Sequence, residues 1–144
     1  MAIRVVGVLV LLLGAAAIAL AAWGLADVDR SVTHWASVAA AKGTTFDGAD
    51  WSRHWRTYSV LFGLVGGCIL SAGASVLRWG ARALPLAASL FVLSALAPWL
   101  YEWLGLANYG FERPGVSETV IAFGVAIGLL LWHLRLRRSS RNGT

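Results

Sequence analysis

The sequence has little charge and almost no cysteine, and both shortages restrict what it can be. Charged residues make up 13% of its 144 residues and hydrophobic residues 58%, whereas roughly a quarter of a soluble domain is charged. Cys68 is the single cysteine, which excludes an intramolecular disulfide and a paired-cysteine motif. The apolar residues are gathered in long blocks, which predicts membrane-spanning helices rather than a soluble core.

The centres of these apolar blocks contain no Asp, Glu, Lys, Arg or His. A charge at such a depth costs at least ~2.5–3.5 kcal/mol, so ionisable residues found there usually take part in transport or catalysis. Their absence argues against a proton relay, an intramembrane protease and a carrier of charged substrates. The serine and threonine residues within the blocks are expected to form hydrogen bonds between helices. We therefore expect neither catalytic residues nor a cofactor.

Four uncharged blocks approach or exceed the length of about 20 helical residues that a span of about 30 Å requires. The fourth is the shortest, and charged side chains at its ends can extend toward water. The sequence predicts an all-α integral membrane protein, a four-transmembrane-helix bundle with an outer loop containing a short amphipathic helix, and 1–144 as one domain. The predicted helices are about 5–26, 57–77, 83–104 and 117–134, with outer loops 27–56 and 105–116 and a basic tail 135–144.

The first apolar block has a second interpretation. Arg4 before an apolar run, with small residues at 19–21, is also typical of a secretory signal peptide. The run is longer than the usual apolar region of such a peptide, which favours a retained helix. Cleavage of residues 1–21 stays open, and it would leave the orientation of the other helices unchanged.

The distribution of charge predicts the orientation of the helices. Positive residues in short loops favour the cytoplasmic side, and Arg78 and Arg82 occupy the short hairpin between the second and third blocks. With this hairpin inside, the inner segments hold seven basic residues and no acid, while all seven acids lie outside or at that edge. Both termini are then cytoplasmic. The excess of arginine over lysine indicates a GC-rich genome and thus a bacterial inner membrane. The basic tail can lie against anionic headgroups, although setting the topology is its simplest role.

The first outer loop is longer than a connector requires. Residues 31–42 fit a helix with Ser31 as its N-cap and Gly43 as its stop. Its apolar residues share a stripe, so the sequence predicts an amphipathic helix lying flat on the membrane. The segment 44–50 is expected to be a turn.

Aromatic residues gather on the outer side, where six of the eight tryptophans fall. An interfacial belt accounts for aromatic residues at either surface but not for this asymmetry. The outer aromatics are expected to pack the two loops together or to present a surface to a partner. Pro98 predicts a kink at this end of the third helix. The candidate partner or interface residues are Trp35, Trp51, His54, Trp55, Trp99, Tyr101, Glu102 and Trp103.

The stretch WSRHWRTY, residues 51–58, is the most distinctive segment of the outer side. Trp51, Trp55 and Tyr58 fall at helical spacing on one face, as an interfacial anchor requires. Arg53 and His54 lie off that stripe, and we expect them to face water or headgroups. The segment is interpreted as a collar at the membrane surface rather than a catalytic site.

The histidines offer one weaker alternative. His34 and His54 could share a metal ion with Asp47 or Asp50 in the outer loop, although no short ligand spacing supports such a site. His133 belongs to the inner end of the fourth helix, so it cannot reach the other two. We therefore predict no metal site.

Small residues recur at spacing four in two of the predicted helices. Such rows let helix backbones approach closely in a membrane. They are expected to pack within the monomer, with packing in a dimer or larger complex as the alternative. The rows are Gly63, Gly67, Ser71 and Ser75 in the second helix, and Gly124 and Gly128 in the fourth.

These features favour a non-catalytic small membrane protein, an accessory, assembly or stabilising component of a membrane complex. The alternative is a protein that handles a lipid or another small apolar ligand in a cavity capped by the outer aromatic loops. The expected partners are the lipid bilayer and either another membrane protein or further copies of the chain. Nucleic acid is excluded because the basic residues form no stripe.

Overall fold

The computed structural model describes residues 2–103 and 116–141, and every regular element in these ranges is a helix. The expectation of an all-α chain is confirmed for this part. The elements are α1 (Ala2–Ala26), α2 (Val28–Lys42), α3 (Gly48–Trp79), the 3-10 helix η1 (Gly80–Ala83), α4 (Leu84–Ala95), α5 (Ala97–Trp103) and α6 (Val116–Arg141).

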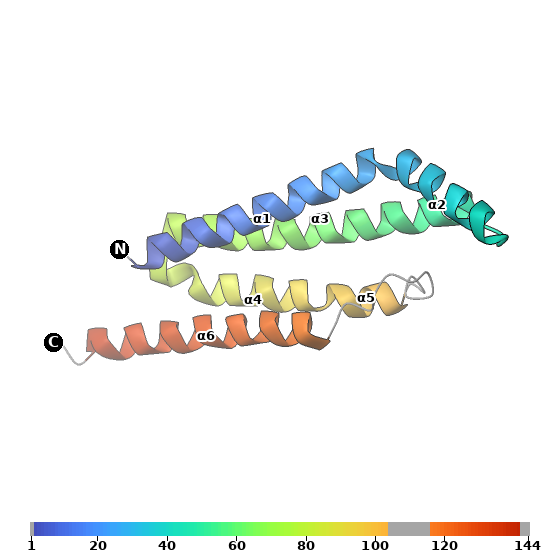
Figure 1. Ribbon diagram of the computed structural model, residues 1–144. Coiled ribbons are helices and arrows are strands. Elements are labelled where there is room, and N and C mark those ends of the chain that lie inside the picture. Colours follow the sequence, from blue (N-terminus) through green and yellow to red (C-terminus); the bar gives the residue numbers. More distant parts are fainter. Residues whose placement is uncertain (1, 104–115, 142–144) are drawn as a thin grey trace.

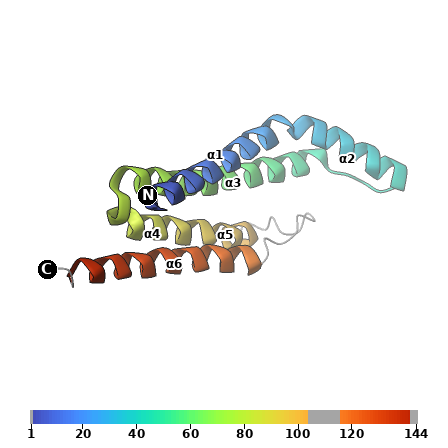
Figure 2. The same ribbon diagram turned by 60° about the vertical axis from the view of Figure 1, so that its left-hand side comes forward.

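The apolar helices lie side by side in a row. Figures 1 and 2 show the order α1, α3, α4 and α6, with α5 continuing α4 and α2 lying beside the start of α3. Packing runs from each helix to its neighbour, so α1 and α6 form the two sides of the row. The described helices of the predicted four-helix bundle therefore form an open layer.

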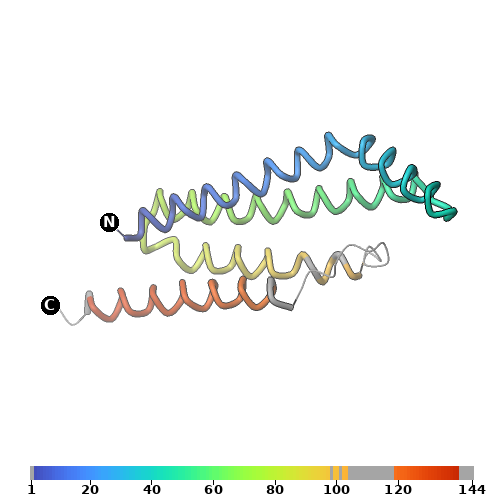
Figure 3. The backbone as a smooth tube through the Cα atoms, in the orientation of Figure 1, coloured from blue at the N-terminus to red at the C-terminus, as the bar shows by residue number. Residues whose placement is uncertain are grey.

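The chain reverses direction at η1. Figure 3 shows that the start of α1, the turn at η1 and the end of α6 lie at one end of the row. We call this the η1 end, and the opposite end, where α2 and α5 lie, the α2 end. Gly80 begins the reversal with φ 58° and ψ −135°, a backbone conformation that glycine adopts far more readily than other residues.

Three helical stretches are long and apolar enough to cross a membrane: Ala2–Ala26, Gly48–Ala95 and Thr119–Ser139. The second contains both α3 and α4, which η1 folds into an antiparallel pair (Figure 1). The number of apolar helices therefore agrees with the four that the sequence predicts. α1 nearly matches its expected bounds, whereas α6 continues beyond 134 through most of the predicted basic tail.

The outer loop expected over 27–56 is largely helical. α3 begins at Gly48, nine residues earlier than predicted, and its 32 residues give a length of about 48 Å. Asp47 caps it, because its side chain accepts a hydrogen bond from the Asp50 amide at 3.0 Å. α2 and the first turns of α3 form a helical hairpin beyond the apolar part of the row.

The predicted start of α2 at Ser31 is wrong, whereas its stop at Gly43 is confirmed. The Asp27 amide still bonds the Trp23 carbonyl at 2.9 Å, and the Ser31 amide bonds the Asp27 carbonyl at 3.0 Å. Helical hydrogen bonding thus continues across the bend at Asp27, and Ser31 lies inside α2. Gly43 ends α2 in the left-handed conformation with φ 66°.

The helix predicted over 83–104 is present in two pieces, and residue 104 lies outside the described residues. α4 ends at Ala95, and the Leu96 amide bonds the Leu93 carbonyl at 3.1 Å in a tighter turn. Helical bonding resumes from Leu100 to Leu96, also at 3.1 Å. Proline at 98 has no amide hydrogen and disfavours a helical conformation before it, which accounts for the break.

α1 and α3 approach each other closely along a seam of small residues. The seam repeats every seven residues on each helix, as Gly7, Gly14 and Ala21 on α1 and as Ser59, Gly66 and Gly73 on α3. All six residues are buried, and we call them the small-residue seam.

The seam brings backbone against backbone. A Cβ atom at Gly14 would lie 2.6 Å from the Leu70 Cα, and one at Gly73 would lie 2.7 Å from the Leu11 Cα. Both positions are too close for any side chain. Gly24, also buried at the end of α1, meets the Ser59 hydroxyl, which a Cβ would approach to 2.8 Å.

The spacing-four row predicted on α3 takes little part in this seam. A Cβ at Gly63 would meet the Ala21 Cβ at 3.3 Å, but one at Gly67 would have no described atom within 4 Å. Ser71 is exposed, and Ser75 is buried. The closest contact therefore follows a period of seven, which keeps the same residues facing the partner helix over several turns.

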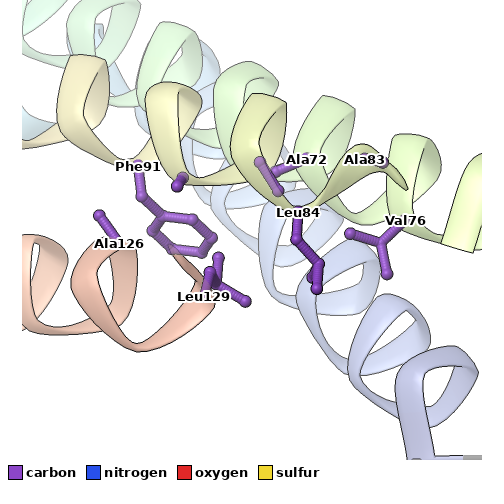
Figure 4. Close-up of a cluster of buried hydrophobic side chains, with 9 residues drawn as sticks. Ala72, Val76, Ala83, Leu84, Phe91, Ala126 and Leu129 are labelled. Atoms are coloured by element: carbon purple, nitrogen blue, oxygen red, sulfur yellow. The ribbon is translucent and has the colours of Figure 1, made fainter. Parts of the chain in front are cut away.

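The core that joins the two halves of the row lies near the η1 end. Phe91 reaches from α4 toward Ala126 and Leu129 on α6, as Figure 4 shows. Leu84, fully buried, packs with Val76 of α3 in the same cluster. Alanines supply the remaining contacts, at Ala72, Ala83, Ala87 and Ala88.

Two buried serines, Ser75 and Ser94, and the exposed Ser89 satisfy their hydroxyl groups within their own helices. Ser75 donates to the Ala72 carbonyl at 2.8 Å, and Ser94 donates to the Phe91 carbonyl at 2.8 Å. Ser89 does the same toward Pro85 at 3.1 Å. These three serines therefore do not form the hydrogen bonds between helices that were predicted from the sequence. Each hydroxyl instead bonds a backbone carbonyl three or four residues earlier in its own helix.

Replacing Gly14 or Gly73 by alanine is expected to destabilise the protein. The added methyl group meets backbone that cannot rotate away, so α1 and α3 must separate, at a cost of about 1–3 kcal/mol. Chemical unfolding of the purified protein in detergent measures the effect.

Gly67→Ala is the matched control, because that position is helical and open. It should be neutral or stabilising by up to about 1 kcal/mol. Equal losses at Gly14, Gly73 and Gly67 would contradict the small-residue seam.

Candidate functional site

An aromatic ladder runs along the α2 end of α3. Trp51 stacks on Trp55 with ring centroids 6.1 Å apart, and Tyr58 stacks on Phe62 at 6.2 Å. Trp55 and Tyr58 join the two pairs at 6.4 Å. Trp35 of α2 extends the ladder through Trp51 at 5.6 Å. The ladder therefore spans the helical hairpin and the start of the apolar part of α3.

Two tryptophans of the ladder hold α3 to its neighbours. The Trp55 indole N–H donates to the Gly24 carbonyl of α1 at 2.7 Å. The Trp51 indole N–H donates to the Ser31 hydroxyl of α2 at 3.2 Å. Both side chains are half-buried. The segment WSRHWRTY, which was predicted to anchor α3 at the membrane surface, therefore also joins α3 to α1 and α2 through hydrogen bonds.

The expectation that His54 faces water is wrong, since it is only 8% exposed. Its Nδ1 donates to the Asp50 carbonyl at 2.7 Å, and the Asp50 carboxylate lies 3.6 Å from the same nitrogen. A ring nitrogen satisfied one turn back along its own helix needs no water. Arg53 is exposed as expected, and its guanidinium pairs with Asp50.

The histidines are not brought together on a metal ion. His34 is exposed, and its ring meets the edge of Trp35 at 5.4 Å, whereas His54 is held by Asp50. Within residues 2–103 and 116–141, no group of three His, Cys, Asp or Glu side chains could hold a metal ion.

The remaining candidates of the outer side lie on α5. Trp99 is 61% exposed and Trp103 is 80% exposed, and Glu102 is exposed beside them. The side chain of Tyr101 and the second outer loop, 105–116, lie outside what the structure describes, apart from the first residue of α6. Packing of the two outer loops into one cap stays a prediction.

An open apolar cleft lies between α3 and the α4–α6 pair. Its volume is about 420 Å³. α3 lines it with Tyr58, Phe62 and neighbouring residues, and α6 lines it with Ile121, Ala122 and Val125. Phe91 of the buried cluster also lines the cleft, on the side toward η1. Figure 2 shows the ribbons of α3 and α4 leaving η1 side by side.

Of the candidate interface residues predicted from the sequence, none whose side chain the structure describes is among the residues that line the cleft. Tyr58 and Ser94 have the only polar side chains among its lining residues, and the Ser94 hydroxyl is already bonded within its helix. The cleft is therefore suited to an apolar group without ionic character.

The glycine pair of α6 faces away from the other described helices. A Cβ at Gly124 or at Gly128 would meet no described atom within 4 Å. The side of α6 that packs on α4 carries Ala126 and Leu129 instead. Neither glycine takes part in packing among the described helices.

Several of these features escape inspection of the sequence. The seven-residue period of the small-residue seam could have been recognised in the sequence. The cleft and the burial of His54 depend on how helices far apart in sequence are placed. Comparison with protein-family models, curated proteins and solved structures found no match.

Replacing Trp55 by phenylalanine is expected to loosen the α1–α3 pair at its α2 end. Phenylalanine keeps an aromatic ring but cannot donate to the Gly24 carbonyl, so about 0.5–1.5 kcal/mol of stability is lost. Hydrogen exchange of the amides around Gly24 measures this opening. Trp99→Phe, on exposed α5, is the control and should leave that exchange unchanged; equal effects would contradict the fastening role of Trp55.

Proposed function

We propose that the protein is a non-catalytic, multi-pass membrane protein that serves as an accessory component of a membrane complex. Four apolar helical stretches cross the bilayer, and the η1 end with both chain termini faces the cytoplasm of a bacterial cell. The α2 hairpin then projects on the outer side. The positive charge of the η1 turn and the acids of the α2 end support this orientation.

The observation that carries the proposal is the uncovered face of α6. Within the part of the chain that the structure describes, α6 packs mainly on α4, through a line that includes Ala126 and Leu129, and its last part also contacts η1. Its outward side exposes Val120, Ile127 and Leu131 by 56–62% and presents the open glycines between them.

Open glycines on such a face favour a helix as the occupant. A lipid chain packs no better against a glycine than against a larger residue. A second helix, in contrast, can bring its backbone into close contact with a glycine. The same protein uses glycines in this way where α1 meets α3. A transmembrane helix of another membrane protein is therefore the proposed occupant of the α6 face.

The protein purified in mild detergent should carry a stoichiometric membrane partner, identified by mass spectrometry. Gly128→Leu should remove it, because the side chain blocks close approach without any clash inside the monomer. Gly67→Leu is the matched control, since Gly67 is an equally open glycine on α3. Purification as a monomer alone, or equal loss of the partner in both variants, would argue against this role.

A second function is favoured by the apolar cleft. A volume of about 420 Å³ lies in the range of about 300–1,000 Å³ that small-molecule sites occupy. An acyl chain is complementary to this lining, which is apolar and contains no charged residue. In this alternative the protein binds a lipid chain or another small apolar ligand between α3 and the α4–α6 pair.

A long-chain fatty acid with a photoreactive diazirine tests this second function. Cross-linked peptides should come from the cleft-lining segments of α3 and α6. Ala122→Phe fills the cleft and should reduce labelling severalfold. Val120→Phe, two residues away on the exposed side of α6, should not. Labelling spread evenly over all apolar helices would reveal ordinary lipid contact and exclude the site.

A further inference from the structure

A second hollow lies at the η1 end, and it is distinct from the apolar cleft. Its volume is about 520 Å³. One wall is η1 with the start of α4, and the other is the last part of α6, which runs beside it in Figure 1. We call it the basic pocket, and its lining residues are Ala81, Arg82, Pro85, His133, Leu136 and Arg137. None of them lines the cleft.

The two walls of the basic pocket are tied together by a hydrogen bond. His133 Nδ1 donates to the Ala81 carbonyl at 3.0 Å, across 52 residues of sequence. This bond holds the imidazole ring in place and keeps the proton on Nδ1. It also fixes the end of α6 relative to η1, so the pocket is a built feature of the fold.

The charge of the pocket is positive. Arg82 and Arg137 line it from opposite walls, and no acidic residue does. Every described acidic side chain lies toward the α2 end, on α5 or in the segment 27–50. An arginine guanidinium presents a planar fork of N–H donors that matches the oxygens of a phosphate group. The pocket is therefore complementary to a phosphate.

Exposed leucines follow two of the lining residues in the sequence. Leu86, next to Pro85, is 47% exposed, and Leu134, next to His133, is 51% exposed. A phosphate bound here has room for attached hydrocarbon directly beside it, which a soluble anion would not need.

We propose that the basic pocket binds the phosphate of an anionic phospholipid headgroup, with the acyl chains lying along α4 and α6. This site rests on the membrane placement proposed above and is independent of the partner on α6. Basic pockets between membrane helices on the cytoplasmic side are suited to such headgroups. The site is more specific than attraction of the whole basic tail, since it uses Arg82 and Arg137 but neither Arg135 nor Arg138.

Native mass spectrometry of the full chain with phosphatidylglycerol or phosphatidylcholine tests the proposal. The wild type should retain phosphatidylglycerol selectively. Arg82→Gln/Arg137→Gln should weaken that binding about tenfold or more, because charge-assisted hydrogen bonds are lost. Arg135→Gln/Arg138→Gln removes the same amount of charge from the η1 end of the protein, outside the pocket, and should retain the lipid. Equal weakening in both double variants would overturn the basic pocket in favour of a diffuse basic tail.

Thermal unfolding in detergent separates a lipid from a free anion. Phosphatidylglycerol should raise the unfolding temperature of the wild type and of the Arg135/Arg138 variant, but not that of the Arg82/Arg137 variant. Inorganic phosphate and phosphatidylcholine should have no such effect. An equal rise with inorganic phosphate would assign the pocket to a soluble anion and overturn the lipid proposal.

Should the Arg82/Arg137 variant fail to fold, Arg82→Gln can be compared with Arg78→Gln. Arg78 is a neighbouring arginine that lies outside the pocket lining, with its guanidinium 5.6 Å from the Trp79 ring. Only Arg82→Gln should lose lipid selectivity. A failure of the membrane placement itself would instead leave every variant unable to enter phosphatidylcholine nanodiscs.

Discussion

The close approach of two helix backbones, α1 and α3, is the contact on which the rest of the structure depends. Gly14 and Gly73 sit where the opposing backbone leaves no space for a side chain. Contact of this kind depends on shape and dispersion forces, so it holds in an apolar medium where burial alone provides no driving force. The tryptophan hydrogen bonds from α3 to α1 and α2 fasten the same pair at its α2 end. α3 thereby becomes the rigid element against which the others are placed.

The α4–α6 pair is held differently. Its buried contacts with α3 include a cluster near η1, where alanines and Leu84 pack. The apolar cleft lies between α3 and this pair. The structure therefore combines a tightly packed pair with a second pair that leaves surface uncovered, and the proposed binding functions all involve that second pair.

The helical class and the number of apolar helices follow from block length and the absence of charge, so the sequence was sufficient to predict them. Gly43 could also be predicted as the end of a helix, because glycine readily adopts the left-handed conformation that ends helices, and its φ is 66°. Gly66 and Gly67 could not be told apart, since only the crossing of α1 over α3 decides which of two adjacent glycines meets a backbone. The basic pocket was hidden for a related reason, as Arg82 and His133 become neighbours only when η1 and α6 are placed side by side.

The small-residue seam also has a consequence for how the chain is assembled. All of its contacts lie within the first 79 residues, in a helix pair joined by α2. A chain synthesised from its N-terminus therefore contains every residue of its tightest contact before α4 is made. The later helices then fold onto a template that already exists. η1, which follows α3 directly, is the point at which the growing chain turns back along that template.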